Sequence, residues 1–375
     1  MDRASKALKI TMTYTSYPLD AHDWRGRFIF DLVAALSRRN DIQLSVFGPP
    51  GPIPVNTNYI GNQSEANWMR NLLERGGIAH IFRQGVVSGY ICGIKLLQLL
   101  RRIYKKSHGV DIFHVNWLQN IIPLIGTKTP LVVSVLGTDH QLLSKPFMVK
   151  LLRRVIGQRR CIIAPNADWM IPDLNLHFGD LAEIRLISFG VHPGFFNITR
   201  SPDMSHQKWL VVLRLTRDKI GPLFDWGKKL FQNGSELHLF GPMQEDVTIP
   251  DWVHYHGPTY PETLREKWFP VATGLITLSR HAEGRPQIIL EAMASGLPVI
   301  ASAIPAHCNI LQKDVTGKLV DSHEEFSAAI EELTVSENNM KLGETAKKHI
   351  KQEIGSWDDC ADRYFNAYQD LLGDK

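Results

Sequence analysis

Residues 273–301, TGLITLSRHAEGRPQIILEAMASGLPVIA, predict a strand, a polar loop, a helix and a second strand in succession. The apolar runs 273–278 and 298–301 have the length and near-continuous hydrophobicity of strands buried in a parallel sheet. Pro286 suits the first turn of the helix between them, and Gly296 suits its C-terminal stop. A strand–helix–strand unit of this kind is the building block of α/β domains, whose sheets are covered by helices on both sides.

The same alternation of short apolar strands with helices or long loops continues along the rest of the chain. Further strands are expected at 8–13, 42–47, 110–115, 131–135, 161–164, 185–188, 209–213, 237–240 and 253–256. Helices are expected at 28–36, after Gly221, from Pro261 and, as a last amphipathic helix, at 357–372.

This rhythm breaks at Gly190–Phe196 and in the polar stretch 199–207, which we interpret as a linker. The fold class predicted is therefore α/β, with two consecutive doubly wound, Rossmann-like domains. The first domain is expected over residues 1–190 and the second over 205–356. Ligands of such folds bind beyond the carboxyl ends of the strands, here expected between the domains.

The composition is that of an ordinary globular chain. Its 375 residues are 44% hydrophobic and 21% charged, which excludes disordered, collagen-like and coiled-coil classes. The cysteines lie too far apart for metal-ligand pairs and are too few for a disulfide framework. The N-terminus lacks the apolar core of a signal peptide, and no run reaches about 18 apolar residues. We therefore expect a cytoplasmic chain without a spanning helix.

The net charge of +4 conceals a gradient along the chain. Residues 1–190 carry 23 Lys and Arg against 13 Asp and Glu, a balance of +10, whereas the remainder has a balance of −6. Halves of opposite sign predict two domains with different partners, and the basic half predicts an anionic surface as its partner.

Two basic helical stretches, residues 95–106 and 145–160, contribute to this positive half. Their Lys and Arg residues alternate with apolar residues, which suits attachment to an anionic membrane surface. The alternative is that both are core-packing helices with solvated basic faces. Nucleic acid is not expected as a partner, because no recognition fold or aromatic stacking motif accompanies the charge.

The loop between the first quoted strand and its helix carries the most chemistry. Glu283 lies in this loop, and Glu291 follows inside the helix. At this spacing the two carboxylates could bind the two ends of one elongated molecule. The amides around Gly284–Gln287 lie at the positive end of the helix dipole, which favours an anion. The alternative is that both glutamates are surface charges of the helix.

The spacing Glu283-x7-Glu291 with Gly284, followed by EAMASGLPVIAS, resembles the signature of the retaining GT-B glycosyltransferases of family 4, the group 1 transferases. This resemblance implies a GT-B fold, with the two domains facing a central cleft and the final helix, 357–375, packing back on the first domain. It implies that Glu291 binds the ribose of a nucleotide and that Glu283 contacts the donor sugar near the reacting carbon. It also implies that a donor diphosphate is held by the loop residues Gly284, Arg285, Pro286 and Gln287.

A second segment, VVLRLTRDKIG at 211–221, is similar to the family's G-R-L-x3-K-G motif, with Leu213 in place of the glycine. The family's arginine and lysine, here Arg214 and Lys219, hold the donor diphosphate. Cations suit this place because negative charge builds on the leaving group as the sugar–phosphate bond breaks. The alternative is a solvated basic turn.

Weaker matches complete the expected donor site. They are Gly241 in the turn after a strand, His256 and Gly257 in a segment like that lining the base pocket, and Gly26 in place of a glycine-rich loop. Leu136 replaces the histidine of the family's H-G-x-D segment. Because no Asp-x-Asp occurs in the sequence, we expect no metal at the site and no cofactor beyond the nucleotide-sugar co-substrate.

The sequence thus predicts a retaining glycosyltransferase that moves a sugar from a nucleotide-diphosphate donor to a glycan or lipid-linked acceptor. In this family the second domain binds the donor and the first binds the acceptor, and no protein nucleophile is required. The alternatives are a GT-B nucleotide-sugar epimerase and a non-catalytic nucleotide-sugar-binding scaffold. The donor base and sugar, the linkage and the oligomeric state are not readable from the sequence.

Overall fold

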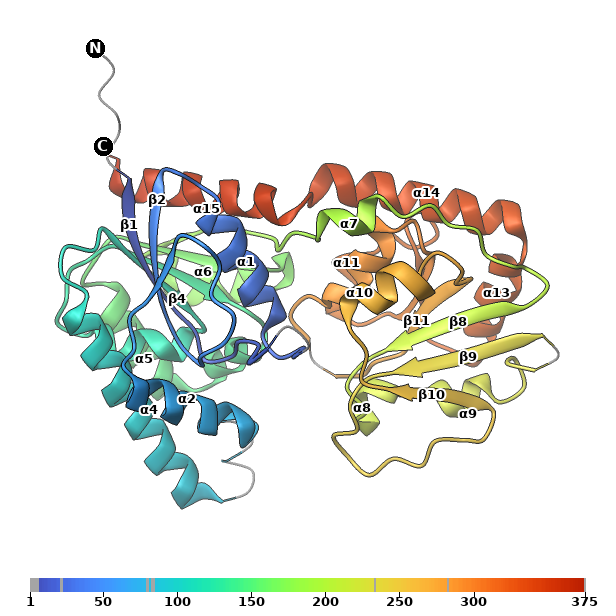
Figure 1. Cartoon of the computed structure of the whole chain (residues 1–375), viewed down its shortest axis with the longest axis horizontal. Coiled ribbons are helices and arrows are strands. Elements are labelled where there is room, and N and C mark those ends of the chain that lie inside the picture. The colour runs from blue at the N-terminus through green and yellow to red at the C-terminus, as the bar shows by residue number, and fades with distance from the viewer. Residues whose placement is uncertain are drawn as a thin grey trace, which may run out of the picture. The chain divides into compact units, whose positions relative to one another are not determined.

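The chain forms two compact units in a computed structural model that describes residues 7–20, 23–78, 81, 85–232, 234–281 and 283–373. The first unit comprises Met1–Phe189 together with Trp357–Lys375, and the second comprises Gly190–Ser356. In Figure 1 the first unit runs from blue to green and ends in the red helix α15, and the second runs from yellow-green to the red helix α14.

A parallel sheet of seven described strands forms the centre of the first unit, in the order β3-β2-β1-β4-β5-β6-β7. The chain starts in the middle of this sheet, builds outward in one direction, and returns to build outward in the other, as in doubly wound folds. The strands are β1 (Leu8–Thr13), β2 (Ile42–Phe47), β3 (Thr57–Tyr59), β4 (Ile112–Asn116), β5 (Leu131–Val135), β6 (Cys161–Pro165) and β7 (Glu183–Ile184).

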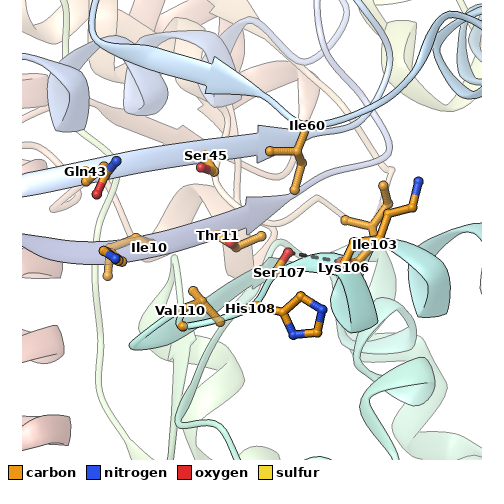
Figure 2. Close-up of a pocket in the computed structure, with 12 residues that line it drawn as sticks. Ile10, Thr11, Gln43, Ser45, Ile60, Ile103, Lys106, Ser107, His108 and Val110 are labelled. Atoms are coloured by element: carbon orange, nitrogen blue, oxygen red, sulfur yellow. Dashed lines mark hydrogen bonds between the residues drawn. The ribbon is translucent and has the colours of Figure 1, made fainter.

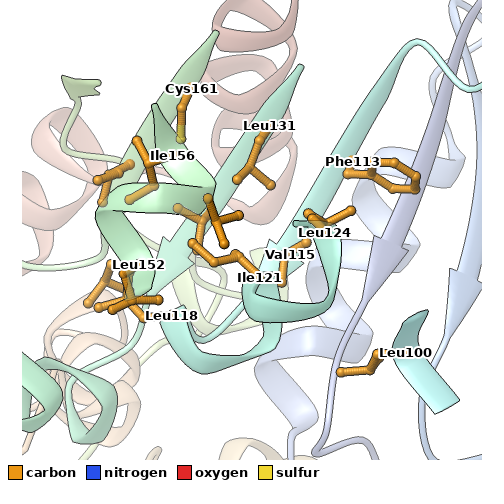
Figure 3. Close-up of a cluster of buried hydrophobic side chains, with 14 of the residues drawn as sticks. Leu100, Phe113, Val115, Leu118, Ile121, Leu124, Leu131, Leu152, Ile156 and Cys161 are labelled. Atoms are coloured by element: carbon orange, nitrogen blue, oxygen red, sulfur yellow. The ribbon is translucent and has the colours of Figure 1, made fainter. Parts of the chain in front are cut away.

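Helices cover both faces of this sheet because successive strand residues point to opposite sides. Ile112 faces one core and Phe113 faces the other. Helices α1 (Arg27–Ser37) and α15 (Trp357–Leu372) lie side by side on the first face (Figure 1). The second face is covered by α4 (Val86–Lys106), η1 (Leu118–Leu124) and α5 (Pro146–Ile156), whose apolar side chains fill the cluster in Figure 3. The remaining described elements of the unit are α2 (Gln63–Glu74), η2 (Thr138–Ser144), η3 (Asp168–Met170) and α6 (Ile171–Phe178).

Helix α15 is fastened to the first unit by buried hydroxyls and by surface ion pairs. The Tyr368 hydroxyl lies 2.6 Å from Nδ1 of His114, whose Nε2 lies 2.8 Å from the Ser134 hydroxyl. Burial lowers the pKa of His114 to about 3, so this imidazole is neutral. Three ion pairs at the surface join Arg38 to Asp358, Arg39 to Asp362 and Arg185 to Asp370.

The second unit contains a parallel sheet of six described strands in the order β10-β9-β8-β11-β12-β13. Its strands are β8 (Gln207–Val212), β9 (Ser235–Phe240), β10 (Val253–Gly257), β11 (Gly274–Thr277), β12 (Val299–Ser302) and β13 (Lys318–Val320). The described helices are α7 (Pro193–Phe196), α8 (Arg217–Ile220), α9 (Leu223–Gly227), α10 (Pro261–Thr263), the π-helical turn η4 (Leu264–Trp268), α11 (Gln287–Ala294), α12 (Pro305–Cys308), α13 (His323–Thr334) and α14 (Ser336–Glu353). The strand order reverses between β8 and β11. The expected pair of doubly wound α/β domains is thus confirmed.

Three details of the sequence prediction are wrong. The strand expected at 185–188 is the short β7 at Glu183–Ile184, and two strands, β3 and β13, were not predicted. The stretch interpreted as a linker is instead packed into the second unit, because Val191 and Phe195 are buried in its core. The Arg200 guanidinium is also buried there, and donates to the carbonyl of Gly296 at 2.6 Å.

Among the described residues, no helix combines the length and the apolar character that crossing a membrane requires.

Replacing Tyr368 by Phe tests the anchoring of α15. The change removes the hydroxyl opposite His114 and leaves a buried nitrogen without its partner, so the free energy of unfolding should fall by about 1–3 kcal/mol. Urea unfolding measures this loss. Gln369→Ala, an exposed position on the same helix, is the control and should change stability by less than about 0.5 kcal/mol. Equal midpoints for the two variants would contradict the anchoring role.

Candidate functional site

The expected site residues of the second unit gather where the loops after β8 and β11 meet. These two strands are neighbours in the sheet and flank the point at which the strand order reverses. In doubly wound sheets the crevice beyond the carboxyl ends of strands at such a point is the usual ligand site. Arg214 and Lys219 follow β8, and Glu283 follows β11.

An ion pair forms the centre of this site. Lys219 Nζ lies 2.9 Å from Oε1 of Glu283, and the two side chains are only 13% and 15% exposed. The Ser279 hydroxyl donates to the same carboxylate oxygen at 3.0 Å. A half-enclosed pair of this kind is screened less by solvent than an ion pair at the surface.

Close backbone contact between the two loops holds the ion pair in place. Gly221 has φ +56°, and a Cβ atom there would lie 2.1 Å from the Leu278 carbonyl oxygen, so a side chain does not fit. The Arg280 amide donates to the Asp218 carbonyl at 2.7 Å, a second link between the loops. Thr216 caps the short helix α8 by accepting from the Lys219 amide, which orients the turn that carries the lysine.

The electrostatics of the site keep Glu283 ionised. Burial raises the pKa of this carboxyl, but the charge and hydrogen bond of Lys219, with smaller contributions from His307 and Ser279, lower it further than burial raises it. The net result is a Glu283 pKa below its ordinary value. The site therefore presents one carboxylate beside a cluster of positive charge.

His281 belongs to this cluster and is neutral at pH 7. Burial lowers its pKa, and the neighbouring charges of Lys219 and Arg214 lower it again, against opposing contributions from Glu283 and Asp218. Its amide donates to the Ser279 hydroxyl at 3.1 Å. The Arg214 and Lys219 side chains place two cationic groups beside Glu283, which suits an anionic ligand.

Three residues of the site were missed by sequence reasoning. Ser279 and His281 lie inside the quoted segment, directly after β11, and only the contacts described above assign them a place beside the ion pair. His307 lies after the neighbouring strand β12; it is buried, with Nδ1 2.8 Å from the Ser302 carbonyl. The signal that could have found His307 is its position just beyond the carboxyl end of a strand next to β11.

Helix α11 directs its N-terminus toward the loop that carries Glu283. The helix begins at Gln287, so Pro286 lies one residue before it rather than in its first turn as expected, with a ψ of 111° that is not helical. Within this described helix the first turn has no acidic residue and no side-chain cap, which leaves its amides suited to an anion. Gly284 and Arg285 lie in the loop before it, and Glu291 lies in its second turn, half-buried.

The Gln287 side chain has a structural contact, because its Nε2 donates to the Gly190 carbonyl at 2.8 Å. This bond ties the start of α11 to the first residues of the second unit.

Gly241 and Gly257 continue the same edge of the sheet beyond β8. A Cβ atom at Gly241, where φ is +134°, would lie 1.7 Å from the Leu213 carbonyl oxygen, so this turn presses against the residue before Arg214. The Gly241 amide donates to the Gly257 carbonyl at 2.8 Å. Both glycines therefore lie along the carboxyl edge that carries Arg214.

His256 takes part in a separate aromatic cluster on the outer strands. Its ring stacks on Phe240 with centroids 4.6 Å apart, and its Nε2 lies 3.0 Å from Nδ1 of His238. Trp268 packs against both imidazoles. Burial lowers the pKa of His238 to about 4 and also lowers the pKa of His256, so both imidazoles favour the neutral form at pH 7. The contacts that His256 makes among the described residues are thus with this aromatic cluster and not with the ion pair.

Gly26 belongs to the first unit, where it caps the N-terminal end of α1. The segment at 136–139 lies in the same unit. Its Asp139 is buried and accepts from the amides of Leu118 and Leu136, each at 2.9 Å, so it fastens the loops after β4 and β5. Burial raises the pKa of Asp139 to about 6.

Two further observations bear on what else the chain could bind. In the described parts of the chain, no three His, Cys, Asp or Glu side chains gather closely enough to hold a metal ion. A hollow of about 230 Å³ in the first unit is lined by Thr11, Ser45, Lys106 and His108 among others (Figure 2). It lies beside the residues that lead into β4, at the opposite edge from the carboxyl ends where ligands of such sheets bind.

Comparison with known proteins identifies the class to which this fold and site are similar. Residues 223–335 match the family described as glycosyl transferases group 1, a range that contains Glu283 and Glu291. Over 96 residues the chain is 37% identical to a probable sucrose-phosphate synthase of Thermosipho melanesiensis, an alignment that covers 26% of this chain and 22% of the relative. The chain spans about a quarter of the length of the curated relatives it matches.

Solved structures extend the likeness to both units. The sucrose-phosphate synthase of Thermosynechococcus elongatus aligns with a TM-score of 0.72 at 16% identity, over 97% of this chain and 99% of that one. Anabaena HepE in complex with UDP-glucose aligns with a TM-score of 0.66 at 13% identity, over 97% and 100% of the two chains. At these identities the likeness establishes the fold, which is that of the GT-B structures. The predicted resemblance to group 1 glycosyltransferases is confirmed.

The glycines at the carboxyl edge provide a matched test of this geometry. Gly241→Ala would force a Cβ atom into the Leu213 carbonyl and should lower the free energy of unfolding by about 3 kcal/mol or more. Gly257→Ala meets no atom within 4 Å and should cost about 1 kcal/mol, from its φ of +73° alone. Chemical denaturation of both variants compares the two costs; equal losses would show that the contact between Gly241 and Leu213 is absent.

Proposed function

We propose that this chain is a retaining, metal-independent glycosyltransferase that moves a sugar from a nucleotide-diphosphate donor to a glycan or lipid-linked acceptor. The observation that carries the proposal is the Lys219–Glu283 pair, with Arg214 beside it, at the carboxyl ends of β8 and β11. The group 1 match over 223–335 and the UDP-glucose bound by the Anabaena structure support a nucleotide-sugar donor.

In the proposed reaction the two cations bind the donor diphosphate. An ammonium group has three N–H donors, so Lys219 can keep its contact with Glu283 and still donate to a phosphate oxygen. As the bond between the anomeric carbon and the phosphate oxygen breaks, the charge that builds on the diphosphate is stabilised by Arg214, Lys219 and the first amides of α11.

The acceptor hydroxyl forms the new bond from the face that the phosphate leaves. Its oxygen bonds to the anomeric carbon, and its proton passes to the departing phosphate oxygen, so the products are a glycoside and a nucleoside diphosphate. Glu283 is proposed to contact the donor sugar and Glu291 the ribose. No metal is needed in this scheme, because Arg214 and Lys219 supply the positive charge and the sequence has no Asp-x-Asp.

The first unit is proposed to bind the acceptor at the cytoplasmic face of a membrane, in the synthesis of a cell-surface polysaccharide or a glycolipid. Support comes from its charge. Even with the acidic α15 included, the residues of this unit carry 25 Lys and Arg against 18 Asp and Glu, a balance of +7, whereas the second unit has a balance of −3.

Thermal-shift measurements with UDP-, GDP- and ADP-sugars test donor binding. A matching donor at about 100 times its dissociation constant should stabilise the chain by about 2.7 kcal/mol. Arg214→Ala should abolish this shift, because it removes a diphosphate contact, whereas Arg217→Ala, an exposed arginine three residues on, should retain it. An undiminished shift in Arg214→Ala would refute the assigned site.

Replacing Glu283 by Gln separates catalysis from binding. The substitution removes a charge beside the reacting sugar, so turnover should fall about 100-fold or more while the donor-induced thermal shift remains. Turnover is measured as nucleoside diphosphate released when an acceptor is supplied. Unchanged activity in a complementation assay would favour the scaffold function, and isomerised nucleotide-sugar formed without an acceptor would favour an epimerase.

A further inference from the structure

Helix α4 of the first unit, located in Figure 1, has one face, which we call the stripe, on which apolar residues are followed by basic residues along the helix. Residues 87, 91, 94, 98, 101 and 105 recur at intervals of three or four and therefore share one face of the helix. At the N-terminal end this face is apolar and exposed, with Val87 73%, Ile91 63% and Ile94 56% accessible; Tyr90, beside them, is 61% accessible. We call these four residues the apolar end of the stripe.

The apolar end is not part of the core packing of α4. The core side of the helix consists of other residues, all buried: Leu96, Leu99, Leu100, Ile103 and Tyr104. Elsewhere in the described chain the large exposed apolar side chains are scattered, whereas four of them fall within residues 87–94. A concentration of this kind marks an interaction surface.

Basic residues follow the apolar end along α4 and form the basic end of the stripe: Lys95, and then Arg101, Arg102, Lys105 and Lys106 near the C-terminus of the helix. Arg101 is only partly exposed and donates to the Pro123 and Ile125 carbonyls, so the accessible charge comes from the other four. Lys105 is exposed, and Arg102 and Lys106 remain largely exposed although both reach toward the carboxylate of Glu65. That carboxylate is itself buried and caps α2. Two hollows, of about 470 and 370 Å³, flank the helix; Arg102 lines both of them.

The second basic stretch, 145–160, keeps Lys145, Lys150 and Arg154 exposed but has a single strongly exposed apolar side chain, Phe147, among its described residues. Arg159 is buried, and Arg153 is bound to Asp180 through a 2.5 Å contact. Arg160 donates to the Asp370 and Gly373 carbonyls, so it fastens the end of α15. Three basic side chains of this stretch are thus engaged by contacts within the first unit, and we therefore confine the proposed membrane contact to α4.

We propose that the α4 stripe docks this protein on an anionic lipid bilayer. The apolar end enters the boundary between headgroups and acyl chains, with Tyr90 at the level where tyrosine is favoured, and the basic end lies against lipid phosphates. Membrane docking is inferred from α4 alone. Only its role, which is to hold the first unit where a lipid-linked acceptor lies, rests on the proposed function.

A second copy of the chain would fit this stripe poorly. Pairing two stripes in parallel would place like cations together, and pairing them antiparallel would bury the apolar end of each against the cations of the other. An anionic bilayer offers acyl chains to one end and negative charge to the other. The complementarity of both ends therefore favours lipid as the occupant.

Flotation of the full-length chain with vesicles of phosphatidylcholine, with and without phosphatidylglycerol, tests the proposal. The chain should float with the anionic vesicles only, and added salt should release it. The double variant Ile91→Ser with Ile94→Ser should bind at least about ten-fold more weakly, because it removes two apolar side chains from the boundary. Leu176→Ser, an apolar residue 77% exposed on α6, is the matched control and should bind as the native chain does.

A charge variant provides an independent arm that leaves the apolar end intact. Lys105→Gln should weaken binding about five-fold, whereas Lys150→Gln, an exposed lysine on α5, should leave it unchanged. The proposal is overturned if the native chain does not float, or if the serine and glutamine variants on α4 float as well as the native chain.

Two further measurements distinguish lipid docking from self-association and from the proposed donor binding. Sedimentation without lipid should give the same mass for the native chain and the double serine variant; a loss of self-association in the variant would identify a second copy as the occupant. The donor-induced thermal shift should persist in the double variant. A native chain that binds vesicles but gives no donor shift would refute the proposed function and leave lipid docking standing.

Discussion

The second unit depends on one close approach of backbone, in which Gly221 lies against the carbonyl of Leu278. This contact brings the loops after β8 and β11 together, although more than fifty residues separate them in the sequence. Because the loops touch, Lys219 and Glu283 meet in a half-enclosed position, where their mutual attraction keeps the carboxyl ionised despite burial. The chemistry of the site is therefore a consequence of where two main chains can approach.

The sequence predicted those parts of the fold in which the residue types themselves indicate whether the segment is buried. Continuous apolar runs such as Leu131–Val135 identify buried central strands, and the strands expected there were found. The short outer strands β3 and β13 were missed, because three residues of mixed polarity give no periodic signal. The stretch after residue 190 was misread since its anchor, Arg200, is of a residue type that is rarely buried; four acceptors around its guanidinium, which no pattern reveals, make the burial possible.

The residues of the candidate site likewise divide into those that the sequence predicted and those that it did not. Arg214, Lys219 and Glu283 were predicted because two motifs place them just beyond strands, and the sheet order then brings them together. Ser279 and His307 were not predicted, because their roles depend on which strand lies next to β11 and on how two loops touch. His256 packs against the aromatic rings of Phe240 and Trp268 rather than against the ion pair, so its position at the end of a strand did not by itself predict its surroundings.

The contacts of the individual cations change how the charge gradient along the chain is interpreted. The balance of +10 over residues 1–190 falls to +7 for the first unit, because residues 357–375 add five aspartates and only two basic residues. Three of the aspartates on α15 pair with arginines of the sheet-bearing part of the unit. Arg153, Arg159 and Arg160 are likewise used to hold the fold together. The net charge therefore overstates the positive charge that is accessible to a partner. On α4 the accessible cations lie on the same helix as four exposed apolar residues. This juxtaposition, rather than the total charge, determines which surface suits an anionic bilayer.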